Sequence, residues 1–363
     1  MRDLDKFRGC LIGGAAGDAL GYPVEFMDEK AIFRRYGQDG ITQFELRNGE
    51  AMMSDDTQMT LFTAVGLVYG HAHGVGLDNI QELAEPINGA YLDWLTTQKQ
   101  RYDPSKTPHV AWLGNCPGLY SLRAPGNTCL NALSQGGGGR INRPINNSKG
   151  CGGVMRVAPI GLFFCDRGTS LDEVGLLGAG AAALTHGHML GWLPGFSLAQ
   201  LIFLLAQDGA DMRTAVEASL GSIRRVFPES TDRDAFLSLM EKATDLAGKD
   251  TDTLSAIHAL GEGWVGDEAL AIAVYCAMKY EGDMERALIA AVNHKGDSDS
   301  TGAIAGNLVG AQIGKSGIPT KYMTQLELLP LIEDVADDLW RDGPDASHAD
   351  AFEEKYVSLR FGR

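Results

Sequence analysis

The sequence predicts an all-α protein. In most of its longer segments the apolar residues recur at intervals of three and four, which places them on one side of a helix. Almost no segment alternates apolar and polar residues as a half-buried strand does. The 363 residues, 44% of them hydrophobic, can bury a large core. We find no repeat of fixed period and no low-complexity linker, so we expect a single domain over residues 1–363, with an acidic helical surface segment at about 320–363.

The composition of the chain limits the classes of binding partner and the cellular location that we expect. The formal net charge of −16 argues against a protein that tracks a nucleic-acid backbone, which needs a basic stripe. The six cysteines show no zinc or redox spacing, which predicts reduced thiols. The first residues lack the apolar core of a signal peptide. We therefore expect a cytoplasmic monomer without a nucleic-acid or membrane partner.

The first predicted helix, residues 3–21, contains many small residues, among them Gly9, Gly13, Gly14 and Gly17. Each glycine inside a helix costs about 1 kcal/mol relative to alanine. Such a run predicts either close helix packing or a close approach of the backbone to a ligand. Glu25 follows this helix, and taken by itself it is typical of a surface acid in a turn.

Two clusters of acids and hydroxyls each open a predicted helix. The first is SDDTQ at residues 54–58, after a loop-like stretch at 30–50, and the second is GDSDSTG at 296–302. Each cluster has a simple alternative as a helix N-cap. A cap needs one acid, however, and adjacent carboxylates repel each other unless a cation lies near them. One shared oxygen-ligand metal site explains both clusters most economically.

Further helices are expected at 80–97, 130–133, 210–250, 267–278 and 283–293. Residues 174–207 contain no Asp, Glu, Lys or Arg, but their Gly, His and Pro residues favour two buried helices broken near 187–194 over a membrane span.

Residues 146–156 (NNSKGCGGVMR) hold three glycines in four positions before an apolar run. Such a loop suits backbone N–H groups that face an anion, although a tight turn is the simpler alternative. His186 interrupts an apolar run and is either a ligand contact or a buried core histidine. Trp264, between glycines, either stacks on a base or fills the core.

Taken together, five segments resemble the ADP-ribosylglycohydrolase family, which includes the dinitrogenase-reductase-activating hydrolase. They occur in the family's order and span nearly the whole chain. They are GGAAGDALG at 13–21 with Glu25, SDDT at 54–57, GCGGVMR at 150–156, THGH at 185–188 and GDSDSTG at 296–302.

The resemblance implies a compact helical fold with two Mg²⁺ or Mn²⁺ ions in a central cleft. It implies that Glu25 lies at the metals or at the attacking water. On chemical grounds, we expect Glu25 or Asp56, in that order of preference, to take the proton of that water. It places His186 and the 150–155 loop at the diphosphate, through Gly150, Cys151, Gly152, Gly153 and Met155, and Trp264 near the adenosine. The implied metal ligands are Ser54, Asp55, Asp56, Asp297, Asp299 and Ser300.

The implied activity is hydrolysis of the C1″ glycosidic bond in ADP-ribosylated protein side chains, arginine first, or in a related ADP-ribosyl compound. Two alternatives share these acids: a binding or structural relative that does not catalyse, and a two-metal phosphoester or pyrophosphate hydrolase. The sequence departs from the nitrogenase-reactivating members at Ala124, where an Asp stands in those proteins. This difference bears on the substrate more than on the reaction.

Overall fold

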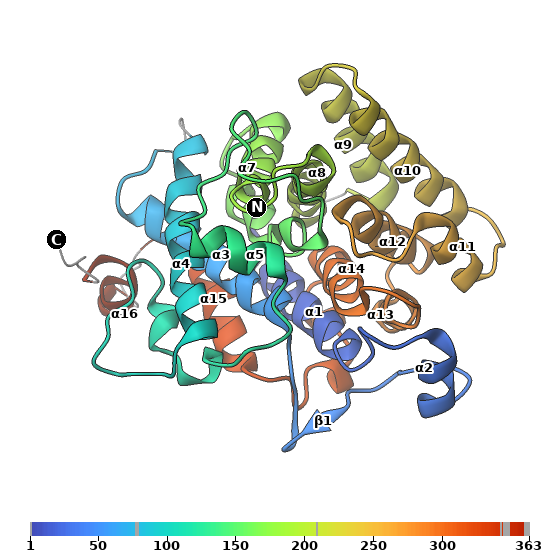
Figure 1. Cartoon of the computed structure of the whole chain (residues 1–363), viewed down its shortest axis with the longest axis horizontal. Helices are drawn as coiled ribbons and strands as arrows, with labels where there is room; N and C mark the ends of the chain where they lie inside the picture. The colour runs from blue at the N-terminus through green and yellow to red at the C-terminus, as the bar shows by residue number, and fades with distance from the viewer. Residues whose placement is uncertain (1, 77–79, 208–209, 342, 344–348, 359–363) are drawn as a thin grey trace.

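The computed structural model describes the whole chain except residues 1, 77–79, 208–209, 342, 344–348 and 359–363 (Figure 1). Its described residues form sixteen α-helices, several short helical turns and a two-stranded antiparallel ribbon. The prediction of an all-α protein is therefore confirmed.

The elements run in the order α1 (Leu4–Gly21), α2 (Glu29–Tyr36), β1 (Leu46–Arg47), β2 (Glu50–Ala51), α3 (Asp55–Ala72), η1 (Ile80–Leu83), α4 (Ala84–Lys99), η2 (Trp112–Asn115), η3 (Pro117–Leu119), α5 (Asn127–Ser134), η4 (Cys151–Gly153), α6 (Ala158–Phe164), α7 (Leu171–Ala183), α8 (Met189–Ala206), α9 (Met212–Val226), α10 (Thr231–Ala247), α11 (Thr253–Leu260), α12 (Gly266–Lys279), α13 (Met284–Val292), α14 (Ser298–Ile313), η5 (Lys315–Gly317), η6 (Thr320–Tyr322), α15 (Leu329–Arg341), α16 (Ala349–Phe352) and the π-helical turn η7 (Glu353–Val357).

Helices α1 and α14 lie antiparallel at the centre and form the most extensive helix pair of the described chain (Figure 1). Their backbones touch, because glycines spaced by four residues face each other. A Cβ built on Gly13 would lie 2.4 Å from the carbonyl oxygen of Gly306, and one on Gly17 would lie 1.9 Å from that of Gly302. The small residues of the first helix therefore serve helix packing.

This pairing brings the end of α1 beside the start of α14. A Cβ on Gly21 would lie 2.2 Å from the carbonyl oxygen of Ser298. The turn that carries Glu25 and the acidic cluster at 297–299 consequently meet in space.

Helices α7 and α8 confirm two buried helices in the apolar run, but the break lies at residues 184–188. Pro194 lies inside α8, so the part of the prediction that placed it in the break was wrong. Close packing holds the helix there: a Cβ on Gly178 would lie 2.4 Å from the carbonyl oxygen of Gly195. Helix α8 is long and apolar enough to cross a membrane, yet 89% of it is buried within the protein, as in a core helix.

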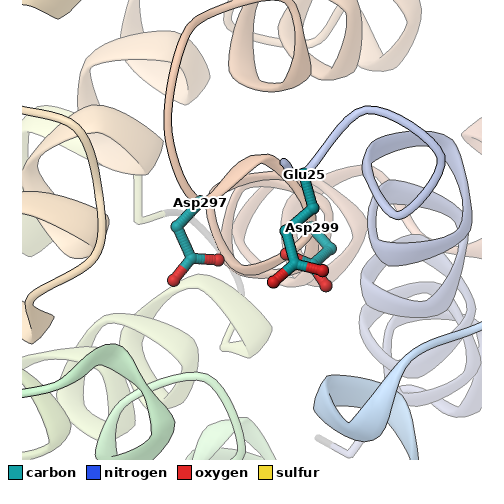
Figure 2. Close-up of side chains that lie close together, drawn as sticks. All are labelled: Glu25, Asp297 and Asp299. Carbon is teal, nitrogen blue, oxygen red and sulfur yellow. The ribbon is translucent and has the colours of Figure 1, made fainter. Parts of the chain in front are cut away.

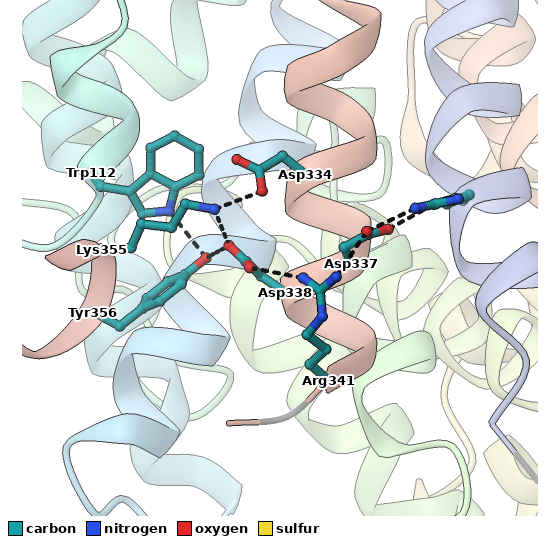
Figure 3. Close-up of polar contacts among 8 residues, drawn as sticks. Trp112, Asp334, Asp337, Asp338, Arg341, Lys355 and Tyr356 are labelled. Carbon is teal, nitrogen blue, oxygen red and sulfur yellow. Dashed lines mark hydrogen bonds and ion pairs between the residues drawn. The ribbon is translucent and has the colours of Figure 1, made fainter. Parts of the chain in front are cut away.

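The prediction of a surface segment at 320–363 is wrong for α15, which packs against α1 and α3 through Ile332, Val335 and Leu339. The turn η7 is held against α15 by polar contacts (Figure 3). There Lys355 Nζ lies 2.8 Å from Asp338 Oδ2, and the Tyr356 hydroxyl donates to the same oxygen at 3.0 Å. Residues 342, 344–348 and 359–363 of that prediction lie outside the described part.

Two other boundaries differ from expectation. The stretch at 30–50, expected to be loop-like, contains α2 and the β1–β2 ribbon. Helix α2 buries Ile32 alone, so its apolar pattern is too sparse to recognise, and its start depends on the Asp28 side chain, which accepts from Ala31 N at 2.8 Å. Helix α5 begins at Asn127, three residues before the predicted start.

The contact between α1 and α14 leads us to a prediction about the stability of the protein. Gly13→Ala should lower the free energy of unfolding by about 1–3 kcal/mol, because a methyl group at the backbone contact forces the helices apart. Urea denaturation measures the change. Gly221→Ala in α9 is the matched control: nothing lies within 4 Å of its built Cβ, so it should raise stability by up to about 1 kcal/mol. Equal changes in the free energy of unfolding for the two variants would contradict the conclusion that Gly13 is needed for close packing of α1 against α14.

Candidate active site

A cavity of about 330 Å³ opens where the end of α1, the starts of α3, α5 and α14, and the η4 loop converge. All the site residues predicted from sequence line it except Ser54 and Gly153. The residues that line it are Glu25, Phe26, Asp55, Asp56, Ala124, Pro125, Gly126, Asn127, Thr128, Cys129, Gly150, Cys151, Gly152, Met155, His186, Trp264, Asp297, Asp299 and Ser300.

Three carboxylates converge at one end of the cavity. Glu25, Asp297 and Asp299 each offer an oxygen, and the three oxygens lie within 4.8 Å of one another (Figure 2). Glu25 comes from the turn after α1 and the two aspartates from the start of α14. All three are buried, so Glu25 is not the surface acid that its local sequence suggested.

Asp18, which sequence reasoning did not assign, positions the neighbouring acids. It is fully buried on α1, and its carboxylate accepts from Ser54 N at 2.9 Å and from Thr57 N at 3.0 Å. Burial raises its pKa to about 6. These bonds hold the start of α3, and hence Asp55 and Asp56, against α1.

The N-cap alternative explains part of each cluster. Ser54 caps α3 by accepting from Asp56 N at 3.2 Å, and Asp297 caps α14 by accepting from Ser300 N at 3.4 Å. Capping gives no account of the other acids of these clusters that line the cavity, Asp55, Asp56 and Asp299. The N-cap alternative therefore holds for Ser54 and Asp297, and metal binding stays a prediction for the other members.

The electrostatics of the acids favour a bound cation. Burial, followed by the charge of Asp297, raises the pKa of Glu25 to about 9. Burial also raises the pKa values of Asp55, Asp56 and Asp299 well above their usual range. Glu25 Oε2 and Asp56 Oδ1 are buried without a hydrogen-bond partner in the described chain. Unpaired, hard oxygen atoms of this kind fit a divalent ion such as Mg²⁺ or Mn²⁺.

The glycine-rich loop lies beside the acids. The Cys151 thiol donates to Asp297 Oδ2 at 2.7 Å. The expectation that the loop's amides face an anion is wrong for Gly150, Cys151 and Met155. The Gly150 N–H donates to Ser148 Oγ at 3.3 Å. The Cys151 N–H donates to the Trp264 carbonyl at 3.2 Å, and the Met155 N–H donates to the Cys151 carbonyl at 3.2 Å. Gly153 serves packing, since a Cβ there would lie 2.5 Å from the Gly191 carbonyl oxygen. Gly150 and Gly152 remain on the cavity wall.

His186 closes the end of the cavity next to this loop. A Cβ on Gly152 would lie 3.2 Å from its Cε1 atom. Burial, with a further contribution from the Arg156 charge, lowers the pKa of His186 to about 3. The imidazole is therefore neutral, and it can meet a phosphate as a hydrogen-bond donor but not as a cation.

An aromatic pair lies at the mouth of the cavity. Trp264 is 39% exposed and stacks on Phe26, with ring centroids 5.8 Å apart. Phe26 follows Glu25 directly in the chain, so this stacking places Trp264 against the turn that carries Glu25. Its predicted place near an adenosine stays a prediction.

Ala124 forms part of the opposite wall, with its backbone in the left-handed region at a φ of 53°. The segment is anchored by the preceding Arg123, which is paired with buried Glu327 at 2.8 Å and whose carbonyl accepts from Asp55 N at 3.0 Å. This wall presents a methyl group where the nitrogenase-reactivating relatives were expected to carry an acid.

Sequence reasoning missed Asp18 and Arg156 although both lie inside segments that it quoted. The signal was available, because each is a lone charged residue in a run of small or apolar neighbours. Such a charge is either exposed or buried for a specific purpose.

The fold and cavity define a class: a helical protein with buried carboxylates that could hold a metal ion, beside a glycine-rich loop. The profile of the family described as ADP-ribosylglycohydrolase matches residues 1–348. The chain therefore belongs to the ADP-ribosylglycohydrolase family, whose enzymes hydrolyse glycosyl bonds.

Two relatives and one solved structure illustrate the similarity. The ADP-ribosylarginine hydrolase Tri1 of Pseudomonas putida is 25% identical over 96% of this chain and 81% of its own. The ADP-ribosyl-[dinitrogen reductase] glycohydrolase of Rhodospirillum rubrum is 25% identical over 89% of this chain and 91% of its own. A solved ADP-ribosylglycohydrolase-related protein complex shares the fold, with a TM-score of 0.59 at 21% identity over 94% of this chain and 99% of its own.

The acid cluster predicts a pH-dependent response to divalent cations. Without a cation the folded protein keeps a proton on Glu25 up to about pH 9, whereas an ordinary glutamate loses it near 4.5. The folded state then binds more protons than the unfolded state between these values, so the free energy of unfolding falls as pH rises across them. A bound cation removes this penalty, and the rise in Tm caused by saturating Mg²⁺ or Mn²⁺ over chelator should be larger near pH 8 than near pH 6.

Calorimetry with each ion and with chelator measures the effect. Asp299→Asn should lose most of the cation-induced rise in Tm. Glu217→Gln, at an exposed acid on α9, should retain it. A Tm that does not respond to cations at either pH would refute the metal site.

Proposed function

We propose that this protein releases ADP-ribose from ADP-ribosylated arginine side chains by hydrolysis at C1″, with two Mg²⁺ or Mn²⁺ ions at the carboxylate cluster. The observation that carries the proposal is the pairing, within one cavity, of buried unpaired carboxylates with a glycine loop and a neutral imidazole. The carboxylates suit the cations and the ribose, and the loop and imidazole suit a diphosphate. The names of the two relatives support an ADP-ribosyl substrate, and that of the Pseudomonas protein supports arginine.

The reaction replaces one bond at the anomeric carbon. The C1″–N bond to the guanidine breaks, positive charge develops at C1″, and a water oxygen forms the new bond there. One proton leaves the water and one reaches the departing nitrogen, so the products are ADP-ribose and the unmodified arginine side chain of the protein. Divalent ions held by Glu25, Asp297, Asp299 and their neighbours would neutralise the charge of these acids and would lower the pKa of a bound water.

Glu25 is the first choice for accepting the proton of the water. Its Oε2 atom has no partner in the described chain, and the group belongs to the three-carboxylate cluster. A cation nearby would lower its raised pKa and make it a carboxylate at neutral pH. Asp56, with Oδ1 also unpartnered, is the second choice.

The test measures ADP-ribose release by chromatography from ADP-ribosylated arginine and serine peptides in parallel. Each peptide is incubated with Mg²⁺, with Mn²⁺ and with chelator. We expect cation-dependent release from the arginine peptide, and a decrease in kcat of about 10²-fold or more in Glu25→Gln. Glu217→Gln serves as the control and should match the unmodified protein.

The products also separate the alternatives. Release from the serine peptide alone would move the linkage from arginine to serine. Formation of AMP would indicate attack at phosphorus, and binding of ADP-ribose without turnover of either peptide would indicate a binding protein. Release that survives complete removal of divalent cations would contradict the metal-dependent mechanism.

A further inference from the structure

Arg156 is a fully buried cation without a carboxylate partner. It is 0% exposed, and none of the ion pairs of the described chain includes it. Its guanidinium lies 4.1 Å from the centroid of the Tyr91 ring, and Nε has no hydrogen-bond partner. A buried charge without a counter-charge destabilises the folded state, so its presence calls for an explanation outside stability.

The other contacts of the guanidinium are to neutral atoms. Nη1 faces the sulfur atoms of Met59 at 3.4 Å and Cys129 at 3.6 Å. Nη2 faces the Ala181 carbonyl at 3.4 Å and donates to Thr185 Oγ1 at 2.6 Å. The short bond to Thr185 is the strongest of these, and it leads toward the cavity.

Thr185 connects the guanidinium to His186. Its Oγ1 atom lies 2.9 Å from His186 Nδ1. The hydroxyl oxygen already accepts from Arg156, so the hydroxyl hydrogen is available for donation to Nδ1. The ring proton then lies on Nε2, which makes no hydrogen bond within the described chain. A Cβ built on Gly150 would lie 3.4 Å from this atom, which places it at the loop wall of the cavity.

We propose that Arg156 is a positioning residue which, through the Thr185 hydroxyl, holds His186 as an Nε2–H donor to the phosphate oxygens of a diphosphate ligand. The buried guanidinium adds a positive potential at the same end of the cavity, opposite in sign to the carboxylate cluster. A diphosphate is thereby directed to the His186 end and the ribose to the acids. The identity of the ligand rests on the function proposed above, whereas the link from Arg156 through Thr185 to His186 rests on the distances between these atoms.

Thr185→Val tests the proposal, because it removes the hydroxyl and nearly preserves the shape of the side chain. We expect the Kd for ADP-ribose, measured by calorimetry, to rise on the order of tenfold, as for the loss of one hydrogen bond to a charged group. The Kd for adenosine, which lacks phosphates, should not change. In hydrolysis assays KM should rise with little change in kcat, and Thr185→Ser should restore both values.

Nitrogen NMR of the imidazole provides a readout that a general loss of stability would not move. The His186 signals are identified by their loss in His186→Gln. In the unmodified protein they should report a neutral ring with its proton on Nε2, and in Thr185→Val a mixture of the two neutral forms. Arg156→Met should produce the same mixture and a larger loss of ADP-ribose affinity. If that variant fails to fold, Thr185→Val decides.

Thr97→Val is the matched control, since Thr97 is also buried but its hydroxyl donates to the Trp94 carbonyl, away from the cavity. It should lower stability without changing ADP-ribose affinity. Unchanged affinity and unchanged NMR signals in Thr185→Val would overturn the proposal, as would a protein that does not bind ADP-ribose. If Thr185→Val weakens ADP-ribose binding while no peptide is hydrolysed, the positioning role stands and the proposed hydrolysis fails.

Discussion

The backbone contact between α1 and α14 is the constraint on which the rest of the structure depends. Glycines at both surfaces let the helices approach until carbonyl oxygens fill the space of missing side chains. Because the helices run antiparallel, this contact places the turn with Glu25 beside Asp297 and Asp299. Asp18, on the same helix, holds the start of α3 against the pair. A methyl group at the contact would therefore disturb both the core and the geometry of the acids.

The chemical properties of the cavity come from charged groups that are buried in the protein core, and burying them lowers the stability of the fold. The cavity is lined by carboxylates, two of whose oxygens have no partner in the described chain, and a guanidinium without an ion pair lies behind His186. Each group alone destabilises the fold. The carboxylates suit a cation, and the guanidinium and imidazole suit an anion, so ligands bound in the cavity would offset the cost.

Features that depend on residues close in sequence could be predicted, whereas features that depend on contacts between distant segments could not. The two acidic clusters were singled out as candidate metal ligands because two acids and two hydroxyls exceed what a helix cap uses. Helix α1 was singled out because glycines are rare in helices without a reason. Helix α2 was missed because it buries one residue, and α15 was placed on the surface because acids on one face obscured its apolar stripe. The buried position of Arg156 was not predicted, because the residues that it contacts, Thr185 and Tyr91, are distant from it in sequence and meet it only in the folded protein.

By itself, the sequence determined the helical class, the residues able to hold a hard cation and the family resemblance, because periodicity, residue chemistry and short motifs are local properties of the chain. Only the tertiary structure decided which acids share a cluster, which atoms lack a partner and which ring nitrogen of His186 faces the cavity. Those depend on distances of a few ångströms between helices far apart in sequence. Such distances are set by how closely the helices pack, and here that closeness comes from the glycines of α1 and α14.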